Sequence, residues 1–568
     1  LGLHTLGRAP DEQHRLATVL LMLGRPFWEA ATAQAGVKPE DVDEALVTEY
    51  DKLPDTAPYQ LLRAHLIDQR PTGGWPAVLR EQIDQASAWY ADIGAGNELP
   101  ALLAALSGRY VATSYGGDPI KNPDAYPTGR NLYGFDPSRV PTRQAWAAGK
   151  AAAEQLLAEH RKQDGAAPTK LTLSLWSVET MRHQGILEAQ ALWLLGVEPV
   201  WDAGGRVIDV TLVPRETLGR PRIDVVLSAT GLYRDHFPNA MKQLAKAVQL
   251  AAEATENDNP VAENARRIAA ALEQQGVPAA AARRAGQTRI FSAESGRYGT
   301  GLDEATLASG RWQGKAEGDR KLARLYLARM QYAYGPDEAD WGKTGVELGG
   351  KDINLYAAHL RGTQGAVLSR SSNTYGMLST DDPFQYLGGI GLAVRYLDGK
   401  PPRLYIANLR GSTGRAERAA QFLAKELATR NFHPGFVKGL MKEGHAGTLQ
   451  VLDGLNNFWG WTAVAREIVR DDQWQEFVDV YVKDKHKLGL DRWFERHNPH
   501  ALAQSIERML EAARQQYWQA DPKVVAELKA RYRDLARRFD VRSDNAAFER
   551  FVGYGVSAAA PAPRVPAA

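Results

Sequence analysis

The fold is decided by residues 170–239, KLTLSLWSVETMRHQGILEAQALWLLGVEPVWDAGGRVIDVTLVPRETLGRPRIDVVLSATGLYRDHFPN. Residues 171–175 and 223–227 are short apolar runs typical of buried strands, and residues 181–195 have the apolar pattern of a helix. Further strands are expected at residues 197–201 and 207–213. This alternation of strand and helix predicts an open, Rossmann-like α/β unit.

Polar side chains follow both buried strands directly. Glu179, Arg182 and His183 follow the first strand, and a second group follows the other strand, namely Ser228, Tyr233, Arg234, Asp235 and Asn239. In open α/β sheets, ligands bind outside the carboxyl ends of the strands. The sequence therefore predicts a binding site at this edge of the sheet.

The whole chain has 568 residues, which is long enough for several domains. We expect a multidomain α/β protein in which helical segments surround open α/β units. The expected parts are a mainly helical segment with an ordered Gly/Pro loop at 1–140, an α/β unit with the site at 141–290, a loop, helix and smaller β/α/β unit at 291–415, a helical region at 416–540, and a tail at 541–568.

Composition excludes several classes of function. The chain has no cysteine, which excludes disulfides, zinc–thiolate sites and cysteine nucleophiles. Its net charge of +2 gives no reason to expect nucleic-acid binding. No apolar run approaches the roughly 20 residues that span a bilayer. Because the chain begins at Leu1 rather than Met, we expect residues upstream.

Two motifs resemble known sites and do not meet their requirements. Residues 342–344, Gly-Lys-Thr, end like a phosphate-binding loop, but the motif needs a glycine at position 337, which is Asp. We therefore expect no ATP site in this chain. His497 and His500 could share a metal ion, but the intervening proline favours a role in helix entry.

Several long motifs together resemble one family. They are WSVETMRHQG (176–185), SATGLYRDHFPN (228–239), PTGRNLYGFDPSRVPT (127–142), RIFSAESGRYGTG (289–301), TDDPFQYLGGIGLAVRYLDG (380–399) and HNPHALAQSIERMLEA (497–512). Together they resemble the large, CobN-type subunit of the cobaltochelatase and magnesium-chelatase family. The resemblance covers roughly residues 108–520.

The resemblance implies an enzyme subunit. Large subunits of this family bind a tetrapyrrole, a corrin or porphyrin ring, into which a divalent ion such as Co²⁺ or Mg²⁺ is inserted. Separate AAA+ partner subunits hydrolyse ATP, which agrees with the missing phosphate loop. The resemblance thus implies an ATP-dependent metal chelatase, with AAA+ subunits and a tetrapyrrole as partners and a cytoplasmic location, or alternatively a periplasmic one.

The reaction needs a base for the pyrrole protons, ligands for the ion and anchors for the acidic side chains of the ring. We assign Glu179, His183 and Glu294 as catalytic residues, and His183 and Asp381 as metal ligands. The expected ring-binding residues are Arg182, Arg234, Asp235, Asn239, Asn373, Asn456 and Asn457. A neutral His183 could take a proton or hold the ion. The alternatives are a hydrogen bond of His183 at a helix terminus, and an Arg234–Asp235 ion pair that locks a loop.

One departure supports a second function. Family members tend to carry a His-Asp pair just before the acidic segment, where this chain has Tyr375 and Gly376. If that pair handles the metal, the chain belongs to a divergent CobN-like branch. The alternative is then a tetrapyrrole- or metallophore-binding protein of an uptake system, without chelatase activity.

Overall fold

The computed structural model describes residues 5–36, 50–114, 119–120, 122–132, 135–410 and 414–553. The chain divides into two compact units, and each is described by itself. The smaller unit holds the described residues up to Asp136, together with the segments 371–374 and 434–439. The larger unit holds the rest.

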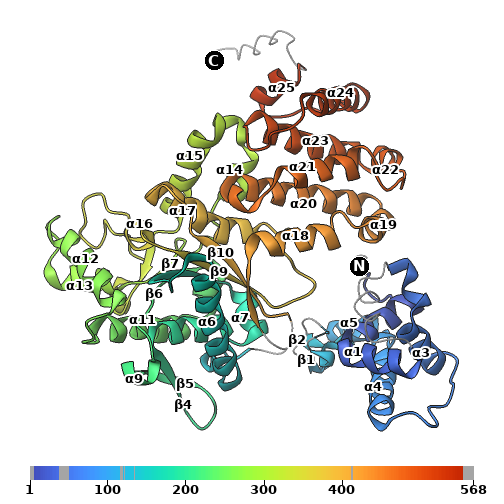
Figure 1. Ribbon diagram of the computed structural model, residues 1–568, viewed down its shortest axis with the longest axis horizontal. Helices are drawn as coiled ribbons and strands as arrows, with labels where there is room; N and C mark the ends of the chain where they lie inside the picture. The colour runs from blue at the N-terminus through green and yellow to red at the C-terminus, as the bar shows by residue number, and fades with distance from the viewer. Residues whose placement is uncertain are drawn as a thin grey trace. The chain divides into compact units, whose positions relative to one another are not determined.

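The smaller unit is a group of helices (Figure 1). They are α1 (Glu12–Gln34), α3 (Ala57–Leu66), α4 (Ala77–Ile93) and α5 (Glu98–Leu106), with a 3₁₀ turn η1 (Tyr50–Asp55) and a two-stranded pair, β1 (Thr113–Ser114) and β2 (Asn131–Leu132). The side chain of Asp11 caps α1 by accepting from the backbone N–H of His14. Leu16, Phe27, Leu62 and Ile83 are buried in a common core. No helix in the described ranges is long and apolar enough to cross a membrane.

The larger unit is built on a seven-stranded mixed sheet with the order β11-β10-β9-β3-β6-β7-β8. Its strands are β3 (Lys170–Leu175), β6 (Asp224–Ala229), β7 (Ile290–Ser292), β8 (Tyr332–Tyr334), β9 (Gly365–Arg370), β10 (Arg403–Asn408) and β11 (Arg415–Arg418). The five central strands are parallel, and β8 and β11 are antiparallel edges. Numbered along the chain, the parallel strands have the Rossmann order 3-2-1-4-5, which changes direction between β3 and β9.

The observed sheet joins segments that we expected in separate parts. Strands from residues 141–290 and from residues 291–415 pair directly through β3 and β9. In contrast, the strands β4 (Val197–Trp201) and β5 (Val207–Leu212) form a separate antiparallel hairpin. The predicted α/β class is therefore confirmed, with one continuous sheet at its centre.

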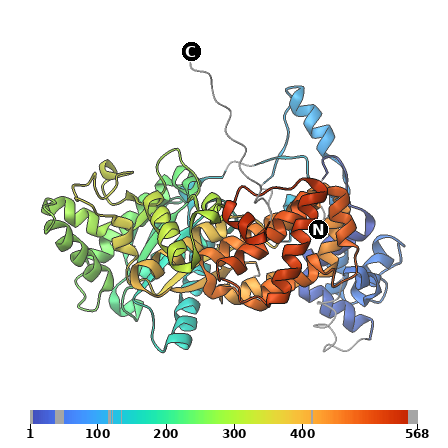
Figure 2. The ribbon, with the colours of Figure 1, turned by 90° about the horizontal axis from the view of Figure 1, so that it is seen from above.

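Helices cover both faces of this sheet (Figure 2). The helices of this part of the chain are α6 (Arg143–Asp164), α7 (Ser177–His183), α8 (Ile186–Leu195), α9 (Arg215–Leu218), α10 (Gly231–His236), α11 (Pro238–Glu253), α12 (Pro260–Glu273), α13 (Ala279–Gln287), α14 (Leu302–Leu307), α15 (Gly314–Arg329), α16 (Leu355–Leu360) and α17 (Gly389–Asp398), of which the short α9 is next to the β4–β5 hairpin instead. Because parallel crossovers are right-handed, α8 and α17, which lead in opposite directions along the sheet, lie on opposite faces. Burial on both faces explains why β3, β6 and β9 are buried at every position.

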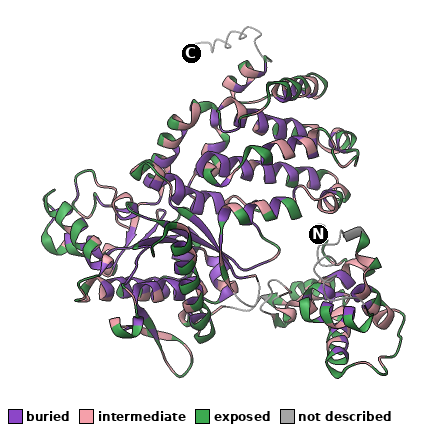
Figure 3. Cartoon of the chain, viewed as in Figure 1, coloured by how far each residue is buried: buried purple, intermediate pink, exposed green. Residues whose placement is uncertain are grey.

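The C-terminal part of the chain is helical. Its helices are α18 (Ala419–Thr429), α19 (Pro434–Lys442), α20 (His445–Val464), α21 (Asp471–Phe477), α22 (Leu490–His497), α23 (Pro499–Arg514), α24 (Pro522–Phe539) and α25 (Ala546–Val552). Figure 3 shows that α20 is buried along most of its length. Trp459, Trp461 and Trp474 are fully buried, so they form core rather than a stacking surface.

Candidate functional site

The segment after β3 forms two short helices instead of the single helix expected from residue 181 onward. Helix α7 ends at His183, and α8 begins at Ile186. The break lies at Gln184 and Gly185, whose φ angles are 56° and 92°. A Cβ on Gly185 would lie 2.7 Å from the Cα of Pro141, so only glycine allows this close approach. His183 therefore lies at the end of a helix, not at its start.

Both ring nitrogens of His183 face protein groups. Nδ1 accepts hydrogen bonds from the backbone N–H groups of Gly185 (3.2 Å) and Ile186 (3.0 Å). Nε2 lies 3.2 Å from the hydroxyl oxygen of Ser369. An Nδ1 that accepts must carry no proton, so the ring is neutral with its proton on Nε2. This geometry gives His183 the helix-terminal role that the sequence left open, and it argues against metal ligation by this residue.

Glu179 lies at the point where the strand order reverses. Its carboxylate is fully buried; Oε1 accepts from Nη1 of Arg182 at 3.2 Å and lies 3.9 Å from Nη1 of Arg370. Arg370 ends β9 and is also fully buried. Within the described residues, none of its three guanidinium nitrogens has a hydrogen-bond partner, and neither does Oε2 of Glu179.

Buried charged groups with missing hydrogen bonds are costly, and they cluster where proteins bind or react. Burial lowers the pKa of Arg370, and the nearby Glu179 carboxylate opposes this shift. Two aromatic rings lie against the arginines: Trp176 packs 4.6 Å from the Arg370 guanidinium, and Tyr375 packs 4.6 Å from that of Arg182. The carboxyl ends of β3 and β9 therefore bring together two cations, one carboxylate and two flat apolar surfaces.

Tyr375 and Gly376 begin a loop, residues 375–382, that follows this centre. Gly376 packs so closely against the carboxylate of Glu426 that any Cβ would collide with it. The same carboxylate accepts from the backbone N–H groups of Met377 (2.5 Å) and Leu378 (3.1 Å). Glu426 thus fixes the path of the loop. Glycine is needed at position 376 because any side chain there would collide with this carboxylate.

Arg234 and Asp235 follow β6 and lock a second loop. Arg234 donates to the carbonyl oxygens of Ala293 and Glu294, both at 2.8 Å, and to Asp235 at 2.8 Å. Tyr298 donates to the other oxygen of Asp235 at 2.8 Å. Burial alone would raise the pKa of Asp235, but hydrogen bonds from Arg234 and Tyr298 lower it. Arg234 therefore holds the loop after β7, as the ion-pair alternative requires.

The remaining residues near this loop face solvent. The carboxylate of Glu294 is half exposed and pairs with Arg297 at 2.9 Å. Asn239 is exposed on the first turn of α11. Neither side chain is part of the buried centre at Glu179. The two groups are joined instead by Ser177 of α7 and His236 of α10, whose Oγ and Nδ1 lie 2.8 Å apart.

An acidic cluster lies at the end of the loop 375–382. Burial and repulsion by Asp303 raise the pKa of Asp381, and burial and repulsion by Asp381 raise the pKa of Asp382 to about 6. Burial and Asp381 likewise raise the pKa of Asp453, which lies on α20. Four carboxyl groups therefore concentrate negative charge in one region.

A preformed metal centre is not present in the part of the chain that the structure describes, because no three His, Cys, Asp or Glu side chains are grouped to hold an ion.

The three asparagines expected to bind the ring lie in different surroundings. Asn457 is buried and donates to the carbonyl oxygen of Leu378 at 2.9 Å, so it supports the loop 375–382. Oδ1 of its neighbour Asn456 is buried without a protein partner among described residues. Asn373 is partly buried in the segment that groups with the smaller unit.

The phosphate-loop-like residues 342–344 form a turn. Lys343 pairs with Asp340 at 3.0 Å, and Thr344 donates its hydroxyl to Glu347 at 2.8 Å. Ala333 and Lys343 form an isolated antiparallel bridge, so the segment is not the start of a helix behind a buried strand. The motif therefore lacks the structural context of a phosphate loop.

The sequence interpretation missed Arg370, Trp176 and Asp382. Arg370 is the last residue of a buried strand. The rule that ligands bind outside the carboxyl ends of strands, which selected residues after 175 and 227, therefore also identifies Arg370. Trp176 is the first residue after such a strand. Asp382 lies in the quoted motif TDDPFQYLGG, where only its neighbour Asp381 was selected.

Comparison with known proteins agrees with this geometry. Residues 1–525 match the family model described as CobN/Magnesium Chelatase, and the chain belongs to this family. It is 32% identical to the aerobic cobaltochelatase subunit CobN of Pseudomonas aeruginosa, over 91% of this chain and 43% of that protein. It is 34% identical to a magnesium-chelatase subunit of Rhodobacter capsulatus, over 82% of this chain and 37% of that protein.

A solved structure supports the same family assignment. The fold matches the catalytic subunit of cobaltochelatase from Mycobacterium tuberculosis with a TM-score of 0.80 and 30% identity, over 94% of this chain and 45% of that one. The chain thus spans less than half the length of these relatives. The resemblance seen in the sequence is confirmed, and none of these relatives bears a name that points to an uptake system.

Proposed function

We propose that this chain is the ring-binding part of a chelatase large subunit, which holds a tetrapyrrole while Co²⁺ or Mg²⁺ is inserted. The observation that carries the proposal is the buried Arg370 at the switch point of a Rossmann-ordered sheet: it has no hydrogen bond with the described residues and only a 3.9 Å ion pair to Glu179. A ring with acidic side chains would supply the carboxylates that such a guanidinium lacks. The family membership and the names of the relatives support this assignment.

The side chains divide into three roles in this proposal. Arg370 and Arg182 bind carboxylates of the ring, and Trp176 and Tyr375 provide flat surfaces at its rim. Glu179 accepts pyrrole protons. Arg234 and Asp235 position the loop that carries Glu294, and His183 positions α8 at the same edge.

The ion is a substrate that enters near the acidic cluster. Asp381 is the proposed direct contact, and Asp303, Asp382 and Asp453 attract the cation by their charge. In this proposal the ring nitrogens supply the other ligands of the ion. ATP hydrolysis is assigned to AAA+ partner subunits, as the resemblance to the family implies. A cytoplasmic location remains a prediction.

An absorbance titration tests the proposal. The purified chain is titrated with a porphyrin and with a hydrogenobyrinate-type corrin, and we expect a saturable spectral shift with one of them. With AAA+ subunits, Asp381→Asn should keep this shift and lose most metal insertion, whereas Asp258→Asn on the exposed surface should keep both. Absence of a shift with either ring would refute ring binding by this chain.

A further inference from the structure

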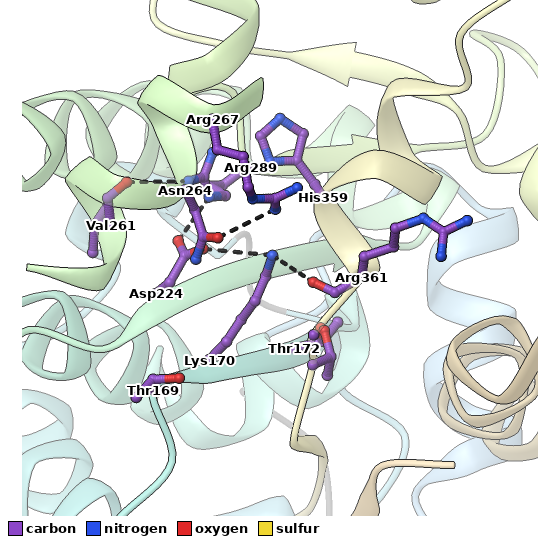
Figure 4. A network of polar contacts seen from close by, with 12 residues as sticks. Thr169, Lys170, Thr172, Asp224, Val261, Asn264, Arg267, Arg289, His359 and Arg361 are labelled. Atoms are coloured by element: carbon purple, nitrogen blue, oxygen red, sulfur yellow. Dashed lines mark hydrogen bonds and ion pairs between the residues drawn. The ribbon is translucent and has the colours of Figure 1, made fainter. Parts of the chain in front are cut away.

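The opposite, amino-terminal edge of the same sheet carries a second cluster of buried charges (Figure 4). Lys170 is the first residue of β3, and Asp224 is the first residue of β6. Lys170 is 2% exposed, and its Nζ donates to the carbonyl oxygen of Arg361 at 3.0 Å and lies 3.6 Å from Asp224. Ring binding and metal insertion use none of these residues.

The centre of this cluster is well bonded and has an excess of positive charge. Asp224 accepts from Nε of Arg289 at 2.7 Å and from the amide of Asn264 at 2.9 Å. Arg289 also donates to the carbonyl oxygen of Gly286 at 2.6 Å. One buried carboxylate therefore faces two buried cations, Lys170 and Arg289.

Two titratable groups report the resulting positive potential. Burial, together with Arg289 and Arg267, lowers the pKa of Lys170 to about 8 against the opposing effect of Asp224. Burial, Arg289 and Lys170 lower the pKa of His359 well below its usual value. His359 is thus neutral, and its Nε2 donates to a backbone carbonyl oxygen at 3.0 Å. On the solvent side of the cluster lies one carboxylate, that of the exposed Glu263.

A cavity of about 350 Å³ opens beside the cluster, lined by Thr169, Lys170, Glu263, Asn264, Arg267 and Arg361, among others. Arg267 and Arg361 are exposed at its rim, and Lys170 forms its inner wall. Of the three N–H groups of Lys170, one is bonded to a carbonyl oxygen and one is directed to Asp224. The cavity volume is about ten times the roughly 30 Å³ that a water molecule occupies in the liquid, so a small organic anion fits.

We propose that this cavity binds the phosphate group of a small phosphomonoester, at a site separate from the ring-binding edge. Two cations from different segments, Lys170 and Arg267, line the space. The guanidinium of Arg361 is directed away from it, to the carbonyl oxygen of Leu397 and to Asp398, and the hydroxyl of Thr169 donates to Gln364. A dianionic phosphate accepts several hydrogen bonds at once and offsets the excess charge of the cluster. The volume leaves room for a few carbon atoms beyond the phosphate.

Calorimetric titration of the whole chain tests the proposal with two probes, inorganic phosphate and glycerol 3-phosphate, against chloride at matched ionic strength. We expect saturable binding of phosphate probes and none of chloride. Arg267→Ala should weaken this binding about tenfold, the scale of one hydrogen bond to a charged group. The control is Arg266→Ala, the neighbouring exposed arginine on α12, which removes the same charge and should leave affinity unchanged.

The two probes distinguish the source of the phosphate. Tighter binding of glycerol 3-phosphate supports a phosphomonoester, and equal affinity supports free phosphate as the natural ligand of the same site. Equal losses in the Arg267 and Arg266 variants, or no binding of either probe, would overturn the proposal. Arg361→Ala, which removes a guanidinium bonded to Leu397 and Asp398, is a second control that should leave phosphate affinity unchanged, and tetrapyrrole binding should remain unchanged in each variant.

Discussion

The two edges of the central sheet treat buried charge in opposite ways. At the amino edge, Asp224 accepts hydrogen bonds from Arg289 and Asn264, and Lys170, 3.6 Å from Asp224, donates to a carbonyl oxygen, so each buried charge is hydrogen-bonded. At the carboxyl edge, Arg370 has no hydrogen bond from any described residue, and its nearest carboxylate oxygen lies 3.9 Å away. Both edges use the ends of the same parallel strands.

The difference separates stability from binding. A buried ion pair with complete hydrogen bonding holds secondary-structure elements together, and removal of one partner is strongly destabilising. A buried guanidinium without hydrogen bonds, paired with a carboxylate only at 3.9 Å, contributes less to stability and is expected where a ligand supplies the missing acceptors. The same residue type, arginine at a strand end, therefore has different consequences at the two edges.

The largest expected effect is at the amino edge. Asp224→Asn should lower the free energy of unfolding by about 3–5 kcal/mol, because Arg289 and Lys170 lose the buried counter-charge that both of them face. Urea denaturation measures the change. Asp258→Asn, which removes the exposed partner of Arg215, is the matched control and should leave the midpoint unchanged. A small effect of Asp224→Asn would show that the network does not hold the sheet together.

At the carboxyl edge, Arg370→Met should weaken tetrapyrrole binding by about 1.5–3 kcal/mol, the scale for hydrogen bonds to charged groups. The free energy of unfolding should stay constant or rise, because a buried charge without hydrogen bonds is replaced by an apolar chain of similar length, and Glu179 keeps its closer partner Arg182. Arg395→Met is the reciprocal control, since Arg395 is bonded to Asp319 and Glu467 at 2.9 and 2.8 Å. It should lower stability and leave ring affinity unchanged.

If Arg370→Met destabilises the protein as strongly as Asp224→Asn and ring affinity stays constant, the two edges do not differ in the way described. Absorbance titration and urea denaturation on the same preparations distinguish these outcomes.

The pH dependence of stability sharpens the difference further. The pKa of Lys170 is about 8 in the folded protein and 10.5 in the unfolded chain, so between these values the unfolded chain binds more protons. The free energy of unfolding should therefore rise with pH, by about 1.5 kcal/mol from this residue between pH 8 and 9.5. Lys170→Met should lack this rise. The difference between the two urea-denaturation series isolates the lysine from other groups that titrate, and identical slopes would contradict the assignment.

The strands could be predicted from the sequence because burial on both faces leaves an apolar run. Residues 171–175 and 223–227 fall on β3 and β6 for this reason. The break between α7 and α8 could not be predicted, because it depends on the approach of Gly185 to Pro141, which lies far away in the sequence. The pairing of Lys170 with Asp224 likewise follows from strand register, which no local pattern encodes.

The sequence could predict which edge of the sheet carries the candidate site, but not the hydrogen-bond partners of its residues. The rule that ligands bind outside the carboxyl ends of strands placed Glu179 and Arg182 correctly at the carboxyl edge. When the same rule is applied to β9, it also identifies Arg370. It could not show that Arg234 is bonded to the carbonyl oxygens of Ala293 and Glu294, because those contacts require the loop after β7 to fold back. Hydrogen-bond partners decide between a binding and a structural role, and only the tertiary structure supplies them.

The smallest expected effect concerns His183, at the carboxyl edge but with both nitrogens facing protein groups. His183→Asn should lower the free energy of unfolding by less than about 1 kcal/mol, because the amide oxygen still accepts a backbone N–H at the break between α7 and α8. Metal insertion with partner subunits should stay at the wild-type level. His183→Ala, which keeps no acceptor, should cost more stability and still support insertion. A tenfold loss of insertion in both variants, with ring affinity unchanged, would instead make His183 a proton acceptor or metal ligand. The carboxyl edge would then hold a reactive group among its well-bonded residues, and hydrogen bonding alone would no longer separate its binding residues from its structural ones.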